Sequence, residues 1–199
     1  PLAHGVDLVV HSTTKYLGGH NDILGGAVIG KRGLIGAIRE QLGTLGAIAD
    51  PLSAYLLTRG IKTLALRLER QNASALRLAA VLERHRAVAQ VWYPLLPSHP
   101  DHAIAIRDLA GGGAVITFEL RGGLAAGTRL LEHLEIPKIA PSLGGVESLI
   151  EQPALMSFYA LAPEDRAALG IREGLVRMSV GIEDVEDLEA DLLAGLERL

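Results

Sequence analysis

An apolar run that leads directly into hydroxyl, lysine and glycine residues limits the possible folds of this chain more than any other segment. Residues 8–10 are Leu-Val-Val, which is the composition of a buried strand. Three hydroxyl residues and Lys15 follow within five positions. Gly18 and Gly19 come next, where the backbone can turn tightly and other groups can approach closely. This pattern predicts a strand that ends in a turn, with Lys15 in that turn.

Lys15 is poorly placed for an ordinary solvated role, because it stands at a strand end among hydroxyl residues. Burial disfavours the charged form of a lysine amine and frees it to act as a nucleophile or base. A Schiff-base lysine behaves in this way and forms a covalent imine with an aldehyde such as pyridoxal phosphate. The hydroxyls of Ser12 and Thr14 could then hydrogen-bond the phosphate. On spacing alone, however, a strand end with a solvated lysine is the commoner meaning of such a pattern.

The whole stretch from Asp7 to Asn21 resembles, position by position, the lysine signature of the Cys/Met-metabolism family of pyridoxal-phosphate enzymes. That family includes cystathionine γ-synthases, cystathionine lyases, methionine γ-lyases and homoserine sulfhydrylases. The resemblance implies that Lys15 is catalytic and that Ser12, Thr14 and Lys15 bind pyridoxal 5'-phosphate. It also implies an α/β fold, the C-terminal part of a fold-type I transferase similar to aspartate aminotransferase.

The resemblance also bears on domain organisation. Family members are longer than these 199 residues and carry the lysine motif near the middle, so we expect the chain to correspond to their C-terminal half. A helical pattern without Gly or Pro runs over residues 62–84. In the family, a long helix at this place joins two domains. The resemblance therefore implies that residues 1–66 end the large cofactor-binding domain and that residues 67–199 form a smaller α/β domain.

Arg177 stands inside an apolar strand pattern at residues 175–180. Because an unpaired guanidinium is too costly to bury, it must find a partner or point into a cleft. On spacing alone, a structural salt bridge to a glutamate and a ligand-binding role remain equally open. The resemblance extends to residues 175–184 and implies that Arg177 binds the substrate α-carboxylate, which suits a planar two-pronged donor. It likewise implies that Ser142, in the loop 142–148, lies near the lysine and the substrate.

Three segments resemble the cystathionine γ-synthase branch most closely, namely residues 19–22, 95–100 and 152–157. Leu143 stands where bacterial cystathionine β-lyases typically carry Trp, which disfavours that activity. The resemblance implies a transsulfuration enzyme that replaces the γ-substituent of an O-activated homoserine with cysteine. A cystathionine or methionine γ-lyase and an O-acyl-homoserine sulfhydrylase would share the same lysine and arginine. A non-catalytic interaction module derived from the family is an alternative of another class.

Composition excludes several other classes of protein. The net charge is −4 with acids and bases interspersed, so no basic stripe predicts nucleic-acid binding. No apolar run approaches the roughly 18 residues of a membrane span, and no leader pattern is visible. His99 and His102 lack a third ligand at metal-binding spacing. Cysteine is absent, which fits a reducing compartment. We therefore expect a cytoplasmic protein without a metal, and the resemblance adds amino-acid substrates and a homotetramer at full length.

Apolar periodicity predicts the remaining elements. Residues 43–46 are expected to break the first helix, Asp50 to cap the second, and residues 141–159 to form a loop. Residues 27–29 should pair with the lysine strand, and the later strands should form a small sheet with helices on one side. The expected strands are 27–29, 88–93, 114–120 and 175–180, and the expected helices are 34–42, 51–60, 62–84, 124–134 and 183–199.

Overall fold

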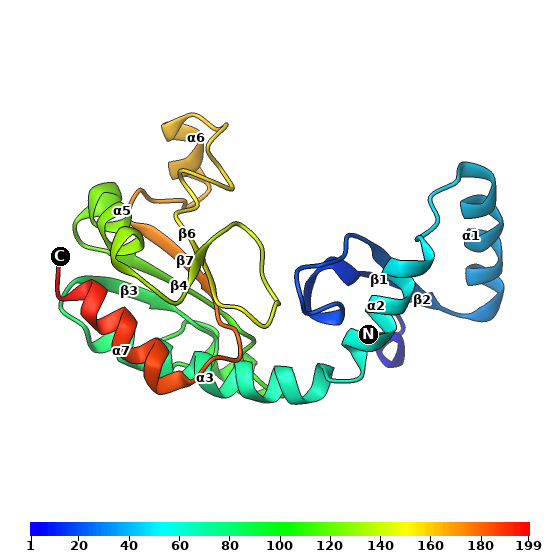
Figure 1. The fold of residues 1–199 in the computed structure, drawn as a ribbon, viewed down its shortest axis with the longest axis horizontal. Helices are drawn as coiled ribbons and strands as arrows, with labels where there is room; N and C mark the ends of the chain where they lie inside the picture. The colour runs from blue at the N-terminus through cyan, green and yellow to red at the C-terminus, as the bar shows by residue number, and fades with distance from the viewer. The chain divides into compact units, whose positions relative to one another are not determined.

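The computed structural model describes residues 1–199 and divides them into two compact units, Pro1–Leu64 and Ala65–Leu199 (Figure 1). Each unit contains its own sheet. The assignment of the units to a cofactor-binding domain and a small domain stays a prediction. None of the helices combines the length and apolar character that crossing a membrane requires.

The first unit contains a two-stranded antiparallel sheet and two α-helices. Residues 26–30 pair with the lysine strand, as predicted, and Val10 lies opposite Val28. The elements of this unit are η1 (Leu2–His4), β1 (Leu8–Ser12), the π-type turn η2 (Thr13–Leu17), β2 (Gly26–Gly30), α1 (Arg32–Leu45) and α2 (Pro51–Ile61).

The ends of α1 and α2 show which residues in the sequence set the helix boundaries. The predicted break at residues 43–46 is confirmed only at Gly46, because α1 continues through Gly43 and a glycine inside a helix costs only about 1 kcal/mol. The helix ends instead before Gly46, which takes a φ of 77° that few other residues adopt. The predicted cap of α2 is confirmed, since one carboxylate oxygen of Asp50 accepts hydrogen bonds from the N–H groups of Leu52 and Ser53 at 2.9 and 3.0 Å.

The second unit is built on a five-stranded sheet in the order β3-β4-β7-β6-β5. All neighbouring strands are antiparallel except β5 and β6, which are parallel. The strands are β3 (Val88–Trp92), β4 (Val115–Leu120), β5 (Lys138–Ile139), β6 (Leu149–Glu151) and β7 (Leu175–Ser179), and the helices are α3 (Leu64–Arg84), α4 (His102–Asp108), α5 (Gly123–His133), α6 (Pro163–Ala168) and α7 (Val185–Leu196).

The core of the second unit lies on one face of its sheet. Ile116 and Phe118 of β4 pair with Met178 and Val176 of β7, and all four side chains are fully buried. They form one cluster with side chains of three helices, namely Leu78 and Leu82 of α3, Leu130 of α5, and Leu188, Leu192 and Leu196 of α7. The single cluster agrees with the expectation that helices cover one side of this sheet.

The other face of the sheet carries polar side chains. Side chains alternate along a strand, so the residues between the core positions point away from the helices. Arg177 of β7 lies between Thr117 of β4 and Glu151 of β6 in the strand register.

Residues 149–151 form the strand β6, so the prediction of a loop over residues 141–159 is wrong there. A strand of three residues is too short to show a periodic signal in the sequence.

Candidate cofactor and substrate site

Lys15 lies where β1 passes into the turn η2. Its φ and ψ of −99° and −129° interrupt the helical dihedral angles of that turn. The carbonyl oxygen of Lys15 accepts a hydrogen bond from the N–H of Gly19 at 2.8 Å, and the N–H of Gly18 donates to the carbonyl oxygen of Thr13 at 3.0 Å. The side chain of Lys15 is partly buried. The amine therefore extends from a turn whose backbone is hydrogen-bonded on both sides.

Two glycines allow the chain to pack tightly around this turn. A Cβ atom on Gly60 of α2 would overlap the carbonyl oxygen of Gly18 and come within 2.9 Å of the carbonyl oxygen of Leu17. A Cβ atom on Gly18 would come within 2.8 Å of the carbonyl oxygen of Thr13. Because backbone oxygens cannot move aside as a flexible side chain can, α2 can pack against the lysine turn only through a glycine.

The two predicted phosphate contacts have different surroundings. The hydroxyl of Thr14 accepts a hydrogen bond from the N–H of Gly25 at 2.9 Å and donates to the carbonyl oxygen of Gly25 at 3.3 Å. Ser12 is exposed, and its hydroxyl makes no hydrogen bond in the structure. The amine of Lys15 and the hydroxyl of Ser12 thus fit an aldehyde cofactor with a phosphate group. Thr14 would have to exchange its bond to Gly25 before it could donate to that phosphate.

In the second unit, Arg177 lies on the polar face of the sheet. Its Nη1 atom is 3.0 Å from Oε1 of Glu151, and the Glu151 side chain is 0% exposed. Its Nη2 atom donates to the carbonyl oxygens of Pro141 and Ser142 at 2.7 and 3.1 Å. Its Nε atom is buried without a hydrogen-bond partner. The salt bridge that the sequence left open is therefore present, and the structure also brings Arg177 to the backbone of the predicted site residue Ser142.

Glu151 is the residue that sequence reasoning did not single out for this site. Its carboxylate meets Arg177 and also accepts hydrogen bonds from the hydroxyl of Ser157, at 2.8 Å to each oxygen. The only signal in the sequence is a single acidic residue after an apolar pair, Leu149 and Ile150. Its partner lies 26 positions later, so only the register of β6 against β7 reveals the pair.

The loop that carries Ser142 is anchored by buried polar groups. The N–H and hydroxyl of Ser148 donate to the carboxylate of Glu183 at 2.6 and 2.8 Å. The side-chain amide of Gln71, which is fully buried, donates to the carbonyl oxygen of Gly145 at 2.8 Å. These contacts tie the loop to α3 and to the segment before α7, and the same loop supplies the carbonyl oxygens that hold Arg177.

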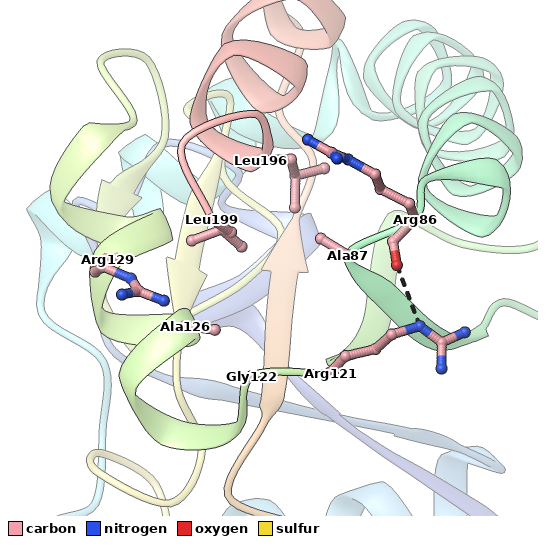
Figure 2. Close-up of a pocket in the computed structure, with 8 residues that line it drawn as sticks. All are labelled: Arg86, Ala87, Arg121, Gly122, Ala126, Arg129, Leu196 and Leu199. Atoms are coloured by element: carbon pink, nitrogen blue, oxygen red, sulfur yellow. Dashed lines mark hydrogen bonds between the residues drawn. The ribbon is translucent and has the colours of Figure 1, made fainter.

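A pocket elsewhere in the second unit contains none of these residues. Figure 2 shows its three arginines, Arg86, Arg121 and Arg129, around a small apolar surface. The Nε atom of Arg121 donates to the carbonyl oxygen of Arg86 at 3.1 Å, and the guanidinium of Arg86 lies 3.4 Å from the carboxylate of Glu197. The lining has no nucleophile and no acid–base residue, so this pocket does not suit the predicted chemistry.

Comparison with known proteins decides the family. Residues 1–197 match the family model described as "Cys/Met metabolism PLP-dependent enzyme". The chain belongs to this family. The predicted family and α/β fold class are therefore confirmed, and the cofactor of the Cys/Met-metabolism enzymes is pyridoxal phosphate, as predicted.

Curated members of the family match the chain over nearly its whole length. The chain is 49% identical over 198 residues to cystathionine gamma-synthase 1, chloroplastic, of Arabidopsis thaliana. It is 46% identical to an L-methionine gamma-lyase of Porphyromonas gingivalis and 46% identical to a cystathionine beta-lyase of Coxiella burnetii. These alignments cover 98–100% of this chain but 35%, 50% and 51% of the three relatives. The chain thus spans about half or less of the length of these relatives.

Solved structures of the family lead to the same conclusion. A crystal structure of cystathionine gamma synthase from Xanthomonas oryzae pv. oryzae, in complex with aminoacrylate and cysteine, has a TM-score of 0.94 and 47% identity. A cystathionine gamma lyase from Micromonospora echinospora has a TM-score of 0.94 and 43% identity. They cover 100% and 99% of this chain, and the chain covers 51% and 52% of theirs. The relatives carry synthase and lyase names at similar identity, so similarity establishes the transsulfuration family and not one member.

Proposed function

We propose that the protein to which these residues belong is a cystathionine γ-synthase, which replaces the γ-substituent of an O-activated homoserine with the thiol of cysteine. One observation carries the proposal: a partly buried lysine on a hydrogen-bonded turn and an arginine anchored on the polar face of a sheet occur in a chain 49% identical to such a synthase. The resemblance of residues 19–22, 95–100 and 152–157 to that branch favours the synthase over the lyases.

The residues of the first unit take the cofactor roles in this proposal. Lys15 would hold pyridoxal phosphate covalently, and Ser12 and Thr14 would donate hydrogen bonds to its phosphate. The bound cofactor supplies an electron sink that stabilises negative charge on the substrate carbon atoms next to the amino group. The amine of Lys15 would remove the Cα proton of the substrate as a general base and would return protons as a general acid.

The residues of the second unit take the substrate roles. Arg177 would bind the α-carboxylate through charge-assisted hydrogen bonds and orient the Cα–H bond toward the amine of Lys15. Ser142 lies on the loop whose carbonyl oxygens hold that guanidinium, and it would contact the substrate. In this proposal residues 1–66 belong to the cofactor-binding domain and residues 67–199 to the small domain of a homotetramer.

Two alternatives to this proposal remain, one within the enzymes and one without catalytic activity. Similarity to methionine γ-lyases, at 46% and 50% identity, favours a γ-lyase as the second candidate, and an O-acyl-homoserine sulfhydrylase would use the same lysine and arginine. A non-catalytic interaction module would keep the fold without the chemistry. The presence of both Lys15 and Arg177 disfavours that reading, because neither is needed for an interaction surface.

The proposal is tested on the intact protein loaded with pyridoxal phosphate. Borohydride reduction and peptide mass spectrometry should find the cofactor on the peptide that contains Lys15. The adduct should be absent from Lys15→Ala and present in Lys31→Ala, a control at an exposed lysine of the same unit. Absence of any adduct in the intact protein would favour the interaction module.

Product analysis then separates the enzymes. With an O-activated homoserine and cysteine, we expect cystathionine as the main product. Faster consumption of sulfide than of cysteine would identify a sulfhydrylase, and release of a thiol from methionine or of cysteine from cystathionine would identify a γ-lyase.

A further inference from the structure

Glu151 is a fully buried carboxylate whose only charged partner is the guanidinium of Arg177. The two residues face each other directly across β6 and β7, on the side of the sheet away from the hydrophobic core. The hydroxyl of Ser157 donates to both carboxylate oxygens at 2.8 Å, so the carboxylate is held from two sides. A buried charge of this kind requires a partner, which here is the arginine proposed to bind substrate.

This pairing restricts the movement of the Arg177 guanidinium and offsets its charge. Glu151 occupies Nη1, the carbonyl oxygens of Pro141 and Ser142 occupy Nη2, and Nε is buried. The guanidinium therefore cannot rotate freely toward an arriving carboxylate. Its positive charge is also already offset by one negative charge before any substrate binds.

We propose that Glu151 is a positioning residue and resident counter-ion of Arg177. It holds the guanidinium in one orientation, and its negative charge lowers the affinity of Arg177 for an amino-acid carboxylate, so that substrate and product are released readily. The inference rests on the proposed function, because it takes Arg177 as the carboxylate-binding group. A residue with only a structural role would have no such effect, since its loss would weaken ligand binding and not strengthen it.

The test measures the dissociation constant, Kd, of sodium propionate, which has the carboxylate of the substrate without its amino group. The intact protein, freed of cofactor, is titrated by NMR at constant ionic strength. Glu151→Gln keeps the shape and an acceptor for Arg177 but removes the charge. We expect it to bind propionate more tightly, on the order of 10-fold, because one repulsive charge near the ligand is removed. Glu173→Gln, at an exposed position before β7, should leave the Kd unchanged.

Ser157→Ala provides a second variant, which removes a hydroxyl at an exposed residue and leaves both members of the Glu151–Arg177 pair in place. Without the Ser157 hydroxyl, the negative charge of Glu151 acts more strongly on Arg177. We therefore expect propionate to bind about 2-fold more weakly, because one hydrogen bond to a charged group that solvent partly screens is lost. In the cofactor-loaded enzyme, Glu151→Gln should lower the KM for the amino-acid substrate more than it changes kcat.

The outcomes test the counter-ion role of Glu151 separately from the carboxylate-binding role of Arg177. Equal or weaker propionate binding by Glu151→Gln, with loss of binding in Arg177→Lys, would overturn the counter-ion role and leave the role of Arg177 intact. Unchanged binding in Arg177→Lys would overturn both, because the carboxylate would then bind elsewhere.

Discussion

The two compact units differ in how much core each contains. In residues 1–64, Ile23 is the only buried large apolar side chain, and α1 buries no residue at all. In residues 65–199, buried side chains from four strands and three helices form one continuous cluster. Burial of apolar surface supplies most of the free energy that opposes chain entropy. The second unit therefore has the means to hold itself together, whereas the first buries little apolar surface of its own.

This difference bears on the proposed function, because Lys15 and Arg177 belong to different units. Lys15 lies in the unit with little core, and Arg177 lies in the unit with a complete one. Large apolar side chains of the first unit are solvent-exposed, including Leu24 at 86%, Val10 at 79% and Leu45 at 77%. With so few apolar side chains buried within the unit, we expect other protein segments to cover part of this surface. We expect the lysine turn to need such cover, while the arginine and its partners do not.

The largest expected effect comes from separating the units. Residues 65–199 expressed alone should show a cooperative thermal transition and dispersed NMR signals, because their core is internal. Residues 1–64 alone should show neither. A cooperative transition in the isolated first unit would contradict the comparison directly.

Cofactor capture should follow the same division. The 199-residue chain contains Lys15, yet we expect borohydride to trap much less pyridoxal phosphate on it than on the intact protein, because the unit that carries the lysine turn buries little apolar surface. The measurement is the fraction of Lys15 peptide that carries the adduct. Equal trapping in the two proteins would show that the turn is self-sufficient.

Single core substitutions should sharpen the contrast. Phe118→Ala removes a fully buried ring from the sheet and should lower the free energy of unfolding by about 3–5 kcal/mol. Leu45→Ala, at a side chain that is 77% exposed, should change it by less than about 0.5 kcal/mol. Denaturant titration of the 199-residue chain measures both, and a comparable loss at Leu45 would mean that the first unit contributes to the cooperative core.

Within the first unit, replacing Gly60 and replacing Gly36 by alanine should have opposite effects on stability. Gly60→Ala places a methyl group against the backbone of the lysine turn and should destabilise the intact protein by about 1–3 kcal/mol. Gly36→Ala, where a Cβ atom meets nothing, should stabilise α1 by about 0.5–1 kcal/mol. Thermal unfolding of both variants checks the prediction, which fails if the two substitutions have the same sign.

The smallest effect concerns the helix caps. The N–H of Glu186 and the nearby Arg70 hold the pKa of Asp184 below its usual value, and the Ser53 hydroxyl does the same for Asp50. A lowered folded-state pKa stabilises the fold above the unfolded pKa of about 3.8, and this contribution is lost as the pH falls through the folded value. If only the second unit unfolds cooperatively, Asp184→Asn should make the free energy of unfolding depend less on pH at acid pH. Asp50→Asn, in the first unit, should leave that dependence unchanged. Equal flattening by both substitutions would contradict the comparison.

Local patterns in the sequence predicted much of this protein. The strands β1, β4 and β7 follow from apolar runs and alternation, and the cap at Asp50 follows from its position before a proline. The family follows from the fifteen residues around Lys15, because a chemical motif is contiguous in the chain. Such features depend on neighbours within a few positions, so they can be recognised without knowledge of the fold.

The features that escaped prediction depend on distant neighbours. The strand β6 exists because a three-residue segment pairs with both β5 and β7, and its own sequence carries no period. The passage of α1 through Gly43 reflects a small local cost that the rest of the helix outweighs.

The sequence by itself determined the family and the residues of the proposed site, namely a lysine with hydroxyl neighbours and an arginine within a strand. Only the tertiary structure decided that Arg177 meets Glu151 and the loop of Ser142, because strand register sets which side chains face each other. The same structure decided that the core belongs almost entirely to residues 65–199, since burial depends on how elements pack and not on the composition of any one of them.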